Sequence, residues 1–244
     1  MNVMEEFSEF RNIRAILFDF DNTLVNFEPN SLKALQEVAR EIHDYIVDNG
    51  FSVSITHEEI YNTLLSISSK FDSEGVYDRT VWFNTLLEKI HVSASKDQVL
   101  EWVSLYWSIA SMARPFEEVQ DTLEFLKKKG YKLGIVTNSD GEGGNKQKRM
   151  ERYEFIKLFD VVVIGGENNI KPKPSVQPLV YACERLGFQP SQCAMVGDDP
   201  VKDCLAAKKA GMMAILVDRQ GKVKFAELYA DFVIDDMEEL QEVF

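Results

Sequence analysis

The sequence has only three cysteines and three histidines, and they form none of the common metal-binding patterns. Cys183, Cys193 and Cys204 make no CxxC pair, and their odd number favours reduced thiols over a disulfide framework. The histidines lie far apart in the chain. We therefore expect neither a zinc site nor a disulfide-stabilised fold.

Positive charge is also scarce, because 27 lysines and arginines face 40 acidic residues, which gives a net charge of -13. This balance argues against binding to nucleic acid or to anionic lipid. No apolar run approaches the roughly 18 residues of a membrane span, and the start, MNVMEEFSEF, lacks the apolar region of a secretory signal. We expect a cytoplasmic protein without nucleic-acid or membrane partners, and we predict no particular oligomeric state.

Short apolar runs that end in polar residues predict the strands of one sheet. The first is IRAILFD at 13–19, and after Arg114-Pro115 helical and strand-like segments alternate. Further strands are predicted at 131–138, 159–166, 192–199, 212–218 and 231–235. Such alternation is typical of right-handed βαβ units. The sequence therefore predicts an α/β fold with a Rossmann-like, doubly wound, mostly parallel sheet.

Between the first two strands, residues 30 to 112 show only helical patterns, with a capping box at Thr56 and Glu59 and a similar start at Ser95. Long structureless loops are rare, so this block is predicted to be an inserted, all-helical domain. The predicted division is a core of 1–26 plus 114–244 and an insert of 27–113, with hinges near Asn26–Pro29 and Ala113–Pro115.

A glycine-rich stretch, DGEGGNKQKR at 140–149, does not match the GxxxxGK[ST] phosphate loop. We interpret it as a flexible loop followed by the solvated start of a helix.

Polar residues follow each of the four central strands, and open α/β sheets bind ligands at this carboxyl edge. Several carboxylates gathered there would repel one another and shift their pKa values. Ligation by oxygen alone, without histidine or cysteine, indicates Mg²⁺ rather than zinc. The residues in question are Asp19 and Asp21; Thr137, Asn138 and Ser139; Lys171, Pro172, Lys173 and Pro174; and Gly197, Asp198, Asp199 and Asp203.

Four segments carry a family resemblance: DxDxT at Asp19–Thr23, the strand end Thr137-Asn138, KPxP at Lys171–Pro174 and GDxxxxD at Gly197–Asp203. In order and separation they resemble the four motifs of the haloacid dehalogenase (HAD) superfamily, and the resemblance spans about residues 12 to 235. The helical insert looks like the C1 cap of the capped, phosphatase-like members.

The resemblance implies catalytic roles. Asp19 would be the nucleophile that forms an aspartyl-phosphate, and Asp21 the general acid and base, with a pKa raised by its acidic neighbours. Thr137 and the backbone N–H of Asn138 would hold the phosphoryl group. Lys171, preferred here over Lys173, would neutralise its charge.

For the metal, the resemblance implies Mg²⁺ bound by Asp19, Asp198 and the backbone carbonyl of Asp21. Asp199 and Asp203 would each be a ligand or an outer neighbour, and Asp203 would hold a metal-bound water or orient Lys171. The expected activity is Mg²⁺-dependent hydrolysis of a small phosphate monoester.

Three alternatives remain at this stage. A phosphomutase keeps all four motifs. A dehalogenase also uses a nucleophilic aspartate, but Asp21 argues for phosphoryl chemistry, since dehalogenases of this family lack an aspartate two residues after the nucleophile. A non-catalytic binding or regulatory relative would keep the fold without the activity.

Overall fold

The computed structural model describes residues 12–244, so the N-terminal stretch examined for a signal lies outside the described residues. The chain divides into two compact units. The first contains Met1–Asn26, Pro115–Asn138 and Met150–Phe244, and the second contains Phe27–Arg114 and Ser139–Arg149. Among the described residues, no helix has both the length and the apolar character that a membrane crossing requires.

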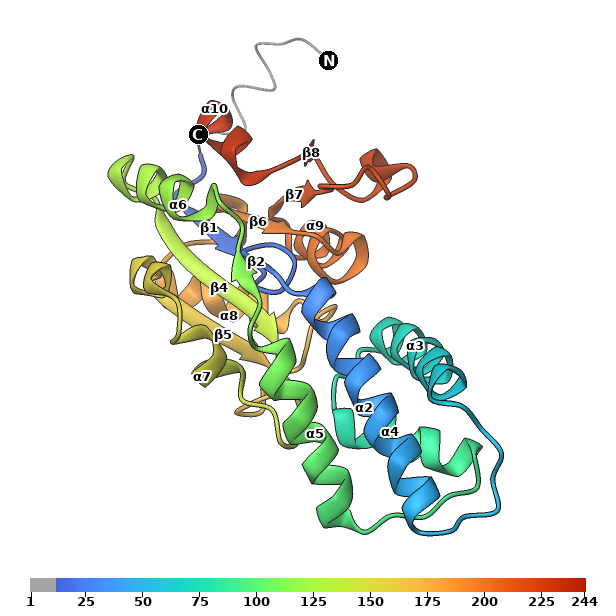
Figure 1. Cartoon of the computed structure of the whole chain (residues 1–244). Coiled ribbons are helices and arrows are strands. Elements are labelled where there is room, and N and C mark those ends of the chain that lie inside the picture. The colour runs from blue at the N-terminus through green and yellow to red at the C-terminus, as the bar shows by residue number, and fades with distance from the viewer. Residues whose placement is uncertain (1–11) are drawn as a thin grey trace. The chain divides into compact units, whose positions relative to one another are not determined.

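The first unit is built on a six-stranded parallel sheet with the order β5-β4-β1-β6-β7-β8 (Figure 1). This arrangement confirms the predicted α/β fold class. From β1 the chain adds β4 and β5 on one side of the sheet, and then β6, β7 and β8 on the other side. The strand order therefore reverses between β1 and β6, which is the topological switch point of the sheet. The strands are β1 (Ala15–Phe18), β4 (Lys132–Asn138), β5 (Val161–Gly165), β6 (Cys193–Gly197), β7 (Met213–Val217) and β8 (Phe232–Ile234).

The central strand β1 is buried along its whole length, which explains its unbroken apolar sequence. Alternate residues face opposite sides of the sheet. Ala15 and Leu17 join a core that includes Leu179 of α8, while the ring of Phe18 packs edge-on against Phe159 at a centroid distance of 6.0 Å. The helices and helical turns of this unit include α6 (Val119–Lys128), η1 (Glu154–Leu158), α8 (Gln177–Leu186), η3 (Pro200–Leu205), α9 (Ala206–Ala210) and α10 (Leu240–Val243).

The second unit is helical, and α2 packs against both α3 and α5 (Figure 1). The capping box is confirmed: Thr56 Oγ1 accepts from the backbone of Glu59, and the Glu59 side chain accepts from the backbone of Thr56. At the start of α5 the side chain of Ser95 accepts from the backbone N–H of Gln98. The helices are α2 (Glu28–Asp48), α3 (His57–Glu74), α4 (Arg79–Lys89) and α5 (Lys96–Ala110).

The chain passes between the units at Asn26–Phe27 and at Arg114–Pro115, where hinges were expected. Two short paired strands, β2 (Val25–Asn26) and β3 (Arg114–Pro115), mark these passages. A second pair of passages, at Asn138–Ser139 and Arg149–Met150, was not anticipated.

Segment 139–149 groups with the helices, whereas the predicted boundaries placed it in the core. Its interpretation as a flexible loop with a solvated helix start is wrong, because Asp140, Lys146 and Arg149 are all buried. Their charges are paired within the segment, so their burial leaves no isolated ion. The short helix α7 (Lys146–Met150) begins here.

Candidate active site

Asp19 follows β1 directly, and its backbone N–H donates to Val196 of β6 at 2.9 Å. The chain then folds into a tight turn in which the backbone N–H of Asn22 donates to Val25 at 2.7 Å. Asn22 adopts the left-handed conformation with φ of 62°, which asparagine tolerates better than most residues. This turn places Asp19 and Asp21 at the carboxyl edge of the sheet, as predicted.

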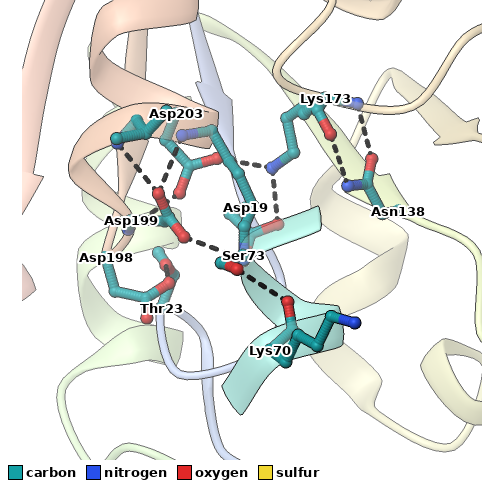
Figure 2. Close-up of polar contacts among 11 residues, drawn as sticks. Asp19, Thr23, Lys70, Ser73, Asn138, Lys173, Asp198, Asp199 and Asp203 are labelled. Carbon is teal, nitrogen blue, oxygen red and sulfur yellow. Dashed lines mark hydrogen bonds and ion pairs between the residues drawn. The ribbon is translucent and has the colours of Figure 1, made fainter. Parts of the chain in front are cut away.

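The lysine that reaches Asp19 is Lys173, and the assignment of this role to Lys171 is wrong. The ammonium of Lys173 lies 2.7 Å from Asp19 Oδ1 and 2.5 Å from Asp203 Oδ1 (Figure 2). Its side chain is 3% exposed, whereas Lys171 is an exposed loop residue. The two carboxylates raise the pKa of Lys173 even though burial alone would lower it. Lys173 is therefore a fixed cation beside Asp19.

The choice between the two lysines follows from Asn138 at the end of β4. Its side-chain amide donates to the Lys173 carbonyl at 3.0 Å and its side-chain oxygen accepts from the Lys173 N–H at 2.8 Å (Figure 2). Lys171 is held differently, since its N–H donates to the side chain of Gln177 near the surface. The side chain of Asn138 thus holds the backbone of Lys173, a contact that we did not predict.

Gly165, at the end of β5, leaves room for the loop that carries Lys173 to lie close to Asn138. A Cβ at this position would overlap Pro172 and the side-chain oxygen of Asn138. A larger residue would therefore displace the loop that presents Lys173.

Asp198 and Asp203 come from the end of β6 and the helical turn η3 that follows it. The Thr23 hydroxyl donates to Asp198 Oδ1 at 3.3 Å. Asp203 Oδ2 accepts from the backbone N–H of Asp199 at 3.1 Å, and a Cβ on Gly197 would overlap the Asp203 carboxylate. Asp203 contacts the ammonium of Lys173, whereas the predicted contact was with Lys171.

The side chain of Asp199 caps the helical turn η3. Its Oδ1 accepts from the backbone N–H groups of Val201 and Lys202 at 2.9 and 2.8 Å, so it caps η3. Its Oδ2 pairs with the Lys202 ammonium at 2.9 Å. Burial would raise its pKa, but the charge and hydrogen bonds of Lys202 lower the pKa on balance. This is the N-cap arrangement expected of an aspartate before proline at the start of a helical turn.

Asp19, Asp198 and Asp203 form a carboxylate cluster, with one oxygen of each within 4.8 Å of the others. Burial, and then the charges of Asp19 and the other neighbouring acids, raise the pKa of Asp198 well above its usual range. Burial and the charge of Asp19 likewise raise the pKa of Asp203 to about 7, although Lys173 opposes this. The cluster holds more negative charge than its lysine balances.

The donor set fits a hard divalent cation. When all three carboxylates are ionised, they and the one ammonium carry two net negative charges, and carboxylate oxygens are the ligands that Mg²⁺ prefers. Asp21 lies outside the three-carboxylate cluster, and its backbone bridges to Val25. Thr137 is buried at the end of β4, in register with Ile164 of β5.

A family model described as haloacid dehalogenase-like hydrolase matches residues 13–211 of the sequence. The chain belongs to this family. The hydrolase is 30% identical to a glyceraldehyde 3-phosphate phosphatase of Methanopyrus kandleri over 227 residues, covering 93% of this chain and 92% of the relative. It is 28% identical to a phosphoglycolate phosphatase of Haemophilus influenzae, covering 93% and 96% of the two chains. The crystal structure of a HAD phosphatase from Thermococcus onnurineus superposes with a TM-score of 0.68 at 28% identity, covering 95% and 97%.

Gly165 was not recognised at the sequence level as making room for the loop that carries Lys173. Lys173 was considered there but ranked below Lys171, and Gly197 was seen only as part of the GDxxxxD motif. A signal for Lys173 was present, because both Lys171 and Lys173 precede a proline. Thr23 was recognised only as part of a motif, without its contact to Asp198.

Proposed function

We propose that this hydrolase cleaves small phosphate monoesters through an aspartyl-phosphate on Asp19. The observation that carries the proposal is the ammonium of Lys173 fixed between Asp19 and Asp203, beside Asp198, at the carboxyl edge of the sheet. The Lys173 ammonium contacts Oδ1 of Asp19, and an oxygen of this carboxylate is the proposed nucleophile. The same cation is placed to offset the charge of a phosphoryl group beside Asp19.

In the first half-reaction, an oxygen of Asp19 forms a bond to phosphorus while the bond from phosphorus to the ester oxygen breaks. Asp21 donates a proton to the departing alkoxide, so the alcohol leaves neutral. In the second half-reaction, Asp21 takes a proton from water, and the water oxygen attacks phosphorus. The bond between phosphorus and the Asp19 oxygen breaks, which releases inorganic phosphate. Asp19 is regenerated as a carboxylate and Asp21 as a protonated acid.

Asp19, Asp198 and the backbone carbonyl of Asp21 are proposed to hold Mg²⁺, with Asp203 orienting Lys173. A bound Mg²⁺ supplies positive charge to the phosphoryl oxygens and keeps the clustered carboxylates ionised. Thr23 holds Asp198 by a hydrogen bond to its Oδ1. Thr137 and the backbone N–H of Asn138 are proposed to bind the phosphoryl oxygens.

The substrate proposed is a small phosphorylated metabolite, and the proposed location is the cytoplasm. The names of the two relatives, which act on glyceraldehyde 3-phosphate and phosphoglycolate, support this substrate size. The second unit is proposed to act as a C1-type cap that selects the leaving group. Asp21, two residues after the nucleophile, favours phosphoryl transfer over dehalogenation.

Phosphate release from p-nitrophenyl phosphate, glyceraldehyde 3-phosphate and phosphoglycolate tests the proposal, with Mg²⁺ or EDTA present. We expect Mg²⁺-dependent turnover by the wild type and none by Asp19→Asn, which keeps the size of the side chain but removes the nucleophile. Halide release from chloroacetate serves as the control for the dehalogenase alternative. Turnover of chloroacetate without any phosphate release would overturn the proposal.

A further inference from the structure

The glycine-rich segment 139–149 is docked on the helical unit by close backbone approach. Gly141 has a φ of 78°, and a Cβ there would overlap the backbone and side chain of Asp78 at the start of α4. Gly143 has a φ of 76°, and a Cβ there would overlap Val103 of α5. The backbone N–H of Glu142 donates to Asp78 Oδ2 at 3.0 Å. The glycines thus serve contact with the helices rather than mobility.

A buried ion cluster closes the segment on itself. Asp140 accepts two hydrogen bonds from the Arg149 guanidinium, at 3.0 and 3.1 Å, and pairs with the Lys146 ammonium at 2.8 Å. The Asp140 side chain is 3% exposed. The guanidinium of Arg149 also lies over the rings of Phe27 and Trp107, at 4.8 and 5.2 Å. A buried, bidentate pair of this kind holds its geometry tightly, because losing either partner would leave a buried charge.

The segment begins one residue after Asn138. The peptide bond from Asn138 to Ser139 leads from the catalytic sheet into the helical unit, and the side chain of Asn138 holds the backbone of Lys173 by two hydrogen bonds. Asp140, which the ion pairs anchor, is therefore separated from Asn138 by Ser139 alone. Two peptide bonds link Asp140 to Asn138, and the two hydrogen bonds of the Asn138 side chain link Asn138 to Lys173.

We propose that segment 139–149 is a positioning element, in which the Asp140 ion cluster anchors the chain so that Asn138 keeps Lys173 at Asp19. The proposed link from the ion cluster to Lys173 runs through the peptide bond between Asn138 and Ser139. Asp140 acts through Asn138 and touches no reacting atom, so it is a positioning residue. The effect on turnover rests on the proposed function, whereas the effect on the Lys173 backbone does not.

Amide hydrogen exchange tests the coupling without any assay of activity. A peptide of residues 171–175 has backbone amides only at Lys173 and Ser175, because Lys171 carries the terminal amine and the two prolines have no N–H. We expect Asp140→Asn to accelerate exchange of the Lys173 amide several-fold. Gly141→Ala, which leaves the ion cluster intact but pushes the segment off α4, should do the same. Glu142→Ala is the matched control and should leave exchange unchanged, since it removes only a surface ion pair with Lys96.

A double-mutant cycle on kcat/KM provides the second readout. Asn138→Ala and Asp140→Asn should each lower kcat/KM by roughly 10- to 100-fold, as expected for a displaced catalytic group. The double variant should be no slower than Asn138→Ala, because both changes act by one route. Effects that multiply, together with unchanged exchange at Lys173, would overturn the coupling. An inactive wild type would instead overturn the proposed function, and the exchange data would still decide the coupling.

Discussion

Replacing Lys173 by methionine is the most direct perturbation of the site. Methionine keeps most of the side-chain length and removes the charge. In the folded protein the ammonium lies 2.7 Å from Asp19 and 2.5 Å from Asp203, and its side chain is 3% exposed. Without it, both carboxylates remain at a crowded site with no cation of their own.

The expected cost follows from this burial. Breaking a buried ion pair by removing one partner costs about 3–5 kcal/mol of unfolding free energy. We therefore expect Lys173→Met to lose about this much stability in EDTA, and Mg²⁺ to restore part of it by neutralising the carboxylates. The kcat should also fall by about 10²- to 10³-fold even with saturating Mg²⁺, because a fixed charge beside the phosphoryl group is lost. Lys171→Met is the matched control and should change neither quantity.

Calorimetry suits the stability measurement. The three tryptophans all lie between Phe27 and Arg114, so their fluorescence reports on the helical unit and not on the sheet. Phosphate release at saturating Mg²⁺ gives the kcat of each variant. If Lys171→Met were inactive and Lys173→Met active, or if Lys173→Met were as stable as wild type in EDTA, the placement of the catalytic cation would be refuted.

Three further changes test other parts of the site and fold. Thr23→Val should raise the Mg²⁺ concentration for half-maximal activity by roughly tenfold, since the hydrogen bond that orients Asp198 is lost; equal metal titration curves would contradict this. Gly197→Ala should abolish activity and lower the melting temperature, because the new methyl group would overlap the Asp203 carboxylate. Asp160→Asn should cost about 1–2 kcal/mol at pH 7, measured by denaturant titration. Burial would raise the pKa of Asp160, but hydrogen bonds from two lysines and a backbone N–H lower it on balance. The stabilisation is complete above the usual aspartate pKa and is lost as the pH falls through the lowered one, so wild type and variant should converge in acid; a constant difference down to pH 2 would argue against this cause.

Much of the fold followed from local patterns. The unbroken apolar runs of the central strands arise because both faces of a parallel sheet are covered, and the polar residues after them converge because all the strands point the same way. The capping box at Thr56 could also be predicted, because it depends only on two residues that lie three positions apart in the sequence. The cap formed by Asp199 was also open to prediction, since an aspartate followed by proline is a common start of a helical turn.

The remaining features depend on tertiary contacts. Lys171 and Lys173 both precede proline, and the two hydrogen bonds from the Asn138 side chain hold the backbone of Lys173 rather than that of Lys171. The glycines of segment 139–149 looked like signs of flexibility, whereas Gly141 is required where the chain passes Asp78. Composition alone does not distinguish a glycine that permits motion from one that permits close approach.

The insertion of a helical unit after β1 has a consequence for synthesis on the ribosome. Ala15 pairs with Lys132 on one side and with Cys193 on the other, so the first strand emerges long before either neighbour. The helices, with their local contacts, can form in the meantime, but they lack segment 139–149 until β4 has also been made. Neither unit can therefore be completed before the other has begun, and the apolar β1 depends on later residues for its protection from aggregation.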